Sequence, residues 1–145
     1  MKLALLIIAA CSVVVPAATA DAHELRPAYL EMRELGDDTF DVLWKVPGRG
    51  DLRLALYVRF PASCKTVQEP VVYSSGDAFI ERWKVKCPGG LVGKAIAVDG
   101  LSTTMTDVLV RLNWTEGATE TTRLDSARTE FLVAGAPSWY QLAWV

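Results

Sequence analysis

The sequence predicts an all-β protein, an antiparallel β-sandwich of the immunoglobulin-like type, preceded by a signal-peptide helix. Three observations carry this prediction. Apolar and polar residues alternate with a period of two in several segments after residue 27, which is typical of half-buried strands. Clusters of glycine, proline, serine and aspartate separate these segments. No window carries an apolar stripe of helical spacing and length, so we expect one sandwich domain over residues 28–134.

The first segment, residues 1–20, has the features of an export signal. Lys2 supplies a positive charge, and the apolar run from Leu3 to Val15 is short for a membrane span. The small-x-small triplet at residues 18–20 is a signal-peptidase pattern, and a second one at residues 20–22 overlaps it. We therefore expect cleavage after Ala20 or Ala22 and a location in the periplasm or at the outer face of the cytoplasmic membrane. Residues 8–11 resemble a lipobox that ends at Cys11, which makes lipidation an alternative. It is a minor one, because Cys11 lies inside the apolar run and not at its end.

A short leader over residues 21–27 would follow the signal, and then the strands. The strongest alternation places Phe40, Val42, Trp44 and Val46 on one face. Strands are expected at residues 28–35, 39–46, 53–60, 71–73, 82–87, 94–98, 107–114 and 130–133. The inward positions include three tryptophans that we interpret as core residues rather than a ligand platform, namely Trp44, Trp83 and Trp114.

The cysteine count predicts one disulfide. Once Cys11 is removed with the signal, only Cys64 and Cys87 remain, an even number in an oxidising compartment. The bridge would close a loop that contributes about 3–4 kcal/mol to the free energy of unfolding on the chain-entropy model. No CxxC redox pair is present, and two cysteines with one histidine do not complete a zinc site without carboxylates.

Composition excludes several classes of function. The chain has 145 residues, 51% of them apolar, and a formal net charge of −2, so it offers no basic footprint for a nucleic-acid partner. His23 is the only histidine, which excludes multi-histidine metal sites and leaves a catalytic triad only if this residue is the base. We therefore expect a protein that is not an enzyme.

The two ends of the mature chain hold the candidate binding residues. Cleavage after Ala20 would give the terminus Asp21-Ala22-His23, whose α-amine, two backbone amides and imidazole can surround Cu(II) or Ni(II) in a square plane. This resembles the amino-terminal copper- and nickel-binding motif. Cleavage after Ala22 would instead leave a two-nitrogen chelate at His23, and the alternative to both is a solvated leader.

The other end, residues 135–145, is an aromatic tail. Trp139, Tyr140 and Trp144 are the residue types that sit at membrane interfaces. They could contact a membrane or a membrane-protein partner, or form a last strand packed on the sandwich.

Four stretches together resemble one known family. They are His23–Glu31, Phe40–Pro47, Glu81–Trp83 leading to Cys87–Leu91, and Gly100–Leu101 with Thr104, Thr106 and Asp107–Arg111. Their order and spacing are similar to the extracytoplasmic N-terminal domain of the HupE/UreJ family, the hydrogenase and urease accessory membrane proteins.

The resemblance implies a role in the handling or delivery of nickel or cobalt at the membrane, and the amino-terminal chelate adds copper to the candidate metals. In the family, a segment like residues 139–145 leads into transmembrane helices, so the tail is expected to be the start of a missing membrane region. The chain would then be a truncated transporter or a stand-alone relative. The alternative, from a different class of function, is a structural or interaction module of a membrane protein complex that binds no ligand of its own.

Overall fold

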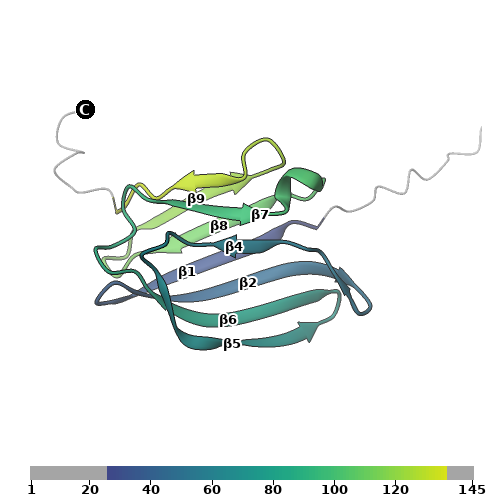
Figure 1. Cartoon of the computed structure of the whole chain (residues 1–145), viewed down its shortest axis with the longest axis horizontal. Coiled ribbons are helices and arrows are strands. Elements are labelled where there is room, and N and C mark those ends of the chain that lie inside the picture. The colour runs from purple at the N-terminus through teal and green to yellow at the C-terminus, as the bar shows by residue number, and fades with distance from the viewer. Residues whose placement is uncertain (1–25, 137–145) are drawn as a thin grey trace, which may run out of the picture.

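The computed structural model describes residues 26–136 and confirms the all-β sandwich within them (Figure 1). Ten strands and one short 3-10 helix make up this part of the chain. The predicted signal helix and the predicted aromatic residues of the tail lie outside the described residues. The elements are β1 (Ala28–Gly36), β2 (Thr39–Arg49), β3 (Leu52–Arg53), β4 (Tyr57–Arg59), β5 (Lys65–Ser75), β6 (Ala78–Lys86), β7 (Ala95–Asp99), η1 (Leu101–Thr103), β8 (Val108–Asn113), β9 (Thr119–Leu124) and β10 (Glu130–Leu132).

The strands form a large and a small sheet. The large sheet runs in the order β5-β6-β2-β1-β8-β9, with the short β3 paired to β2, and the small sheet runs β10-β7-β4. In Figure 1, β4 and β7 of the small sheet lie over the β1, β8 and β9 side of the large one. The buried residues of both sheets belong to one continuous core cluster, which is what makes the two sheets a sandwich.

The predicted inward positions are confirmed in the strongest strands. Val42 and Val46 are fully buried, as are Val108 and Leu112. Trp44 is also buried, and its indole N–H donates to the backbone oxygen of Leu56 at 3.3 Å. Trp83 is buried as well, whereas Trp114 is only partly buried against the core.

One pairing differs from the antiparallel prediction. β1 pairs with β2 in antiparallel fashion but with β8 in parallel, Ala28 opposite Val108 and Met32 opposite Leu112. Alternation reports which face of a strand is buried and carries no information on strand direction. The central strand β1 therefore lies between β2, which follows it directly in the chain, and β8, which comes much later.

Strand boundaries differ where packing overrides the local pattern. The predicted strand at residues 53–60 is reduced to β3 and β4, because Leu56 turns into the core with no sheet partner. The predicted 71–73 strand is the end of the much longer β5. β9 was not predicted, since Thr119–Leu124 is almost entirely polar, although threonine is a good strand former.

The edge strand β5 is exposed along its whole length. Its pairing with β6 is interrupted by register shifts between Thr66 and Gln68 and between Gln68 and Val71, and Pro70 removes one backbone donor. Bulges and proline of this kind hinder pairing with another chain at an open sheet edge.

Within residues 26–136, no helix is long and apolar enough to cross a membrane.

Candidate functional site

The predicted disulfide is confirmed. The sulfurs of Cys64 and Cys87 are bonded, and the Cα atoms lie 4.0 Å apart. Cys87 follows β6 and is fully buried, whereas Cys64 precedes β5 and is only partly buried. The bridge therefore holds the beginning of the exposed strand β5 against the core.

The other predicted site residues lie outside the described part of the chain. Asp21, Ala22 and His23 precede Arg26, and Trp139, Tyr140 and Trp144 follow residue 136. Among the described residues, no group of three or more histidines, cysteines or acids is placed to hold a metal ion. The terminal chelate and the aromatic anchor therefore stay predictions.

The outward face of the large sheet concentrates positive charge. On each strand the residues that alternate with the buried ones point away from the small sheet. Basic residues outnumber the two acids among them, Glu31 and Asp41, although the whole chain is acidic. We call this surface the basic face and define it by Arg33, Lys45, Arg82, Lys84, Lys86, Arg111 and Arg123.

Strand register arranges these side chains in rows across the sheet. Arg82 of β6 lies beside Leu43 of β2, which lies beside Glu31 of β1, which lies beside Arg111 of β8. The adjoining row begins with Lys84 and contains the two residues of an ion pair, Arg33 and Asp41. The result is a surface of long cationic side chains with an open hollow of about 370 Å³ among Arg33, Asp41, Arg82 and Lys84.

Some of the charges at the basic face are paired. Arg33 Nη2 donates to Asp41 Oδ2 at 3.0 Å. Lys86 Nζ lies 2.9 Å from Asp37 Oδ2, and this contact raises the pKa of the ammonium and lowers the pKa of the carboxyl. The Tyr29 hydroxyl donates to Glu31 at 2.6 Å, and burial together with this bond raises the pKa of the phenol.

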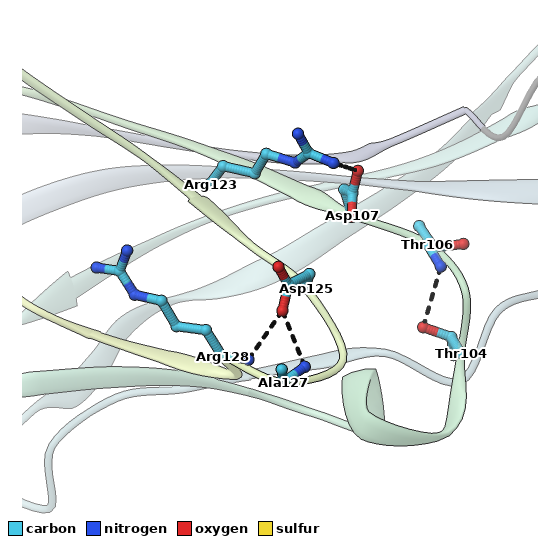
Figure 2. Close-up of polar contacts among 7 residues, drawn as sticks. All are labelled: Thr104, Thr106, Asp107, Arg123, Asp125, Ala127 and Arg128. Atoms are coloured by element: carbon cyan, nitrogen blue, oxygen red, sulfur yellow. Dashed lines mark hydrogen bonds and ion pairs between the residues drawn. The ribbon is translucent and has the colours of Figure 1, made fainter.

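Arg123 pairs with Asp107 at the edge of the basic face (Figure 2). Beyond this pair, in the β9–β10 turn, Asp125 accepts the backbone N–H groups of Ala127 and Arg128 at 2.8 and 2.9 Å. These two hydrogen bonds lower the pKa of the Asp125 carboxyl.

Four basic residues of the face make no ion pair within residues 26–136. Arg111 donates to Asn113 Oδ1 at 3.1 Å, and the other three are Lys45, Arg82 and Lys84. They lie on the neighbouring strands β2 and β6, so their charges reinforce one another. An unpaired cluster of cations attracts a negatively charged surface over a range set by the ionic strength.

A cleft opens where the β2–β3 hairpin meets the chain segments before β1 and β8. Its volume is about 610 Å³, and three arginines line it against one aspartate. A smaller cleft of about 300 Å³ shares Arg26, Pro47 and Asp77 with it and reaches Tyr29 and Lys45 on the outer sheet face. We call the larger one the hairpin cleft; the lining residues used below are Arg26, Arg49, Leu52, Arg53, Asp77 and Thr106.

Two ion pairs hold the wall of the hairpin cleft. Arg26 pairs with Asp77, and Arg53 pairs with Glu81. Arg53 also donates from Nη2 to the Leu56 backbone oxygen at 3.4 Å and lies over the Tyr57 ring, with its guanidinium carbon 5.5 Å from the centroid. Its position is therefore fixed from three directions.

Gly48 shapes the same wall. A Cβ at this position would lie 2.3 Å from the ring of Phe79, so glycine lets the hairpin approach β6 without displacing this ring.

Neither the basic face nor the hairpin cleft is predictable from the sequence, and the reason is the same for both. A net charge averaged over the chain hides a one-sided distribution, and Arg26, Arg49 and Arg53 come together only through folding. The basic face had a signal in the alternation, since Arg82, Lys84 and Lys86 interleave with buried Trp83 and Val85.

No family model and no curated protein matches the chain. The resemblance to the HupE/UreJ family is therefore a prediction that rests on the four sequence stretches alone.

Proposed function

We propose that this chain is an exported, non-enzymatic domain of the HupE/UreJ type that acts as an interaction module at the outer face of the cytoplasmic membrane. Its basic face would lie against a surface of anionic lipid headgroups. The observation that carries the proposal is the cluster of unpaired cations, Lys45, Arg82 and Lys84, on the outer sheet face of a chain whose formal net charge is −2.

Charge complementarity and shape favour a lipid surface over other acidic partners. The basic face is broad and open, so laterally mobile headgroups can adjust to its fixed rows of cations. Each lysine or arginine held near an anionic bilayer contributes about 1 kcal/mol to the free energy of binding. The tyrosines Tyr29 and Tyr73, on β1 and β5, are residue types that tolerate the interface between water and lipid.

Co-sedimentation with vesicles tests this proposal. We expect the signal-free chain to bind phosphatidylglycerol vesicles at low salt, to release them as salt rises, and to ignore pure phosphatidylcholine vesicles. Arg82→Gln combined with Lys84→Gln should weaken binding about thirtyfold, because two contributions of this size are lost.

The matched control removes two charges elsewhere. Arg59→Gln with Arg128→Gln changes the net charge by the same amount at exposed positions outside the basic face and should leave binding nearly unchanged. Equal loss in both double variants would show that net charge rather than the basic face drives binding. A preference for oligonucleotides over vesicles would contradict the choice of partner.

A second candidate function, metal handling, rests on the sequence Asp21-Ala22-His23 at the predicted cleavage point. Four nitrogens in a plane suit Ni(II) or Cu(II) rather than zinc. Titration of the cleaved chain with either ion should produce a d–d absorption band that His23→Ala abolishes. A band that survives this substitution, or an added N-terminal tag, would rule the terminal chelate out.

A further inference from the structure

We propose that the hairpin cleft is a binding site for a small organic oxyanion, a carboxylate or phosphate group that carries a short apolar portion. The site is distinct from the rows of the basic face and does not depend on the proposed membrane role.

The first support is an unpartnered hydroxyl. Thr106 is the one buried polar residue among residues 26–136, with 8% of its surface exposed, and it lines the hairpin cleft. Its backbone N–H donates to Thr104 Oγ1 at 3.4 Å (Figure 2). Its own hydroxyl makes no hydrogen bond within the described residues. The Oγ1 atom is not one of the fully buried polar atoms that lack a partner, which among the described residues are Arg53 Nε and Trp114 Nε1, so it is reached by solvent and is available to a ligand or to water in the cleft.

The second support is charge. Arg53 and Arg26 are each balanced by an acid, Glu81 and Asp77. The guanidinium of Arg49, which also lines the cleft, has no ion-pair partner in residues 26–136. The cleft is therefore left with an uncompensated cation, and a guanidinium binds carboxylate and phosphate through paired, charge-assisted hydrogen bonds.

The third support is the apolar part of the lining. Leu52 is 76% exposed, and both it and Leu54 line the cleft together with Pro47. A cleft with a few polar groups among apolar ones fits a ligand that has both characters. An alkyl chain against Leu52 would remove this side chain from water, while the charged end meets Arg49 and Thr106.

Titrations followed by NMR test the site with defined probes. Hexanoate and hexyl phosphate are the oxyanions, and hexan-1-ol is the neutral analogue. We expect saturable binding of at least one anion, with shifts at residues 49, 52 and 106, and no comparable binding of the alcohol. Arg49→Gln should weaken anion binding about tenfold through the loss of a charge-assisted hydrogen bond.

The Thr106 variants separate a ligand role from a structural one. Thr106→Val removes the hydroxyl and should weaken anion binding several-fold, whereas Thr106→Ser keeps it and should bind as the unmodified chain does. Arg128→Gln, outside the cleft, is the charge control. The proposal is overturned if hexan-1-ol binds as tightly as the anions, or if Arg49→Gln and Thr106→Val both leave anion affinity unchanged.

A lipid headgroup presents the same chemistry as a free acid. A short-chain phosphatidylglycerol below its micelle concentration therefore forms the last arm of the experiment. Tighter binding of this lipid than of hexyl phosphate identifies a headgroup site, and the reverse order identifies a site for a free small acid. If none of the anions binds, the oxyanion site is ruled out. The vesicle experiment is independent of this result, because Arg82→Gln with Lys84→Gln changes no residue that lines the hairpin cleft.

Discussion

Gly100 shows how strongly one residue can be constrained. It precedes η1 with φ +88°, in the left-handed region that favours glycine. A Cβ on this residue would also lie 2.2 Å from the backbone oxygen of Ala55. The backbone conformation and the close contact both require glycine, and together they fix the loop after β7 against the segment before β4.

Gly100→Ala should therefore lower the free energy of unfolding by about 3 kcal/mol or more, because steric overlap with backbone adds to the cost of the left-handed conformation. Gly117→Ala is the matched control: φ is +92° there, but no atom lies within 4 Å of the added Cβ. This control should lose only about 1–2 kcal/mol. Urea denaturation measures both, and equal losses would contradict the contact.

At the residue scale, the buried positions were predictable and the polar partnerships were not. Alternation identifies Val42 and Trp44 as inward because the side-chain period of a strand is two. The local sequence does not predict the ion pair between Arg53 and Glu81. The two residues lie on β3 and β6, which become neighbours only because both strands pair with β2.

At the scale of elements, the disulfide joins the most and the least protected parts of the large sheet. β6 contributes buried Trp83 and Val85, whereas β5 is exposed throughout. With few apolar contacts of its own, β5 depends on its hydrogen bonds to β6 and on the covalent link beside Cys64 to stay in place.

Removal of the bridge should destabilise the whole domain and loosen β5 in particular. For Cys64→Ala with Cys87→Ala we expect a loss of about 3 kcal/mol in the free energy of unfolding, as the chain-entropy model gives for a loop of 23 residues. Hydrogen exchange should show β5 amides losing protection before those of β2. Reductant should lower the stability of the unmodified chain and leave the variant unchanged; a variant that still responds to reductant would contradict this assignment.

Elements with apolar alternation were predictable, and those fixed by neighbours were not. Residues 39–46 and 107–114 became β2 and β8 nearly as predicted. β9 forms because β8 offers a partner edge, which a polar segment such as Thr119–Leu124 can use without any apolar signal of its own.

At the scale of the whole molecule, the fold places basic side chains on one face of the large sheet. Average charge gave no reason to expect an attraction for acidic surfaces, yet the large sheet places cations on one face and buries apolar residues on the other. The fold class was predictable from the periodicity of the strands and from the turn residues. The clustering of basic residues on one face was not, because it depends on the order of the strands in the sheet.

The parallel pairing of β1 with β8 has a consequence for the order in which the chain folds during synthesis. β1 obtains its first neighbour within a hairpin, but its other edge stays open until residues 108–113 have been made. Non-local pairing of this kind closes late and slowly. The newly made chain therefore carries an unsatisfied central edge for most of its synthesis, which is the period in which a chaperone or a second nascent chain has access to it.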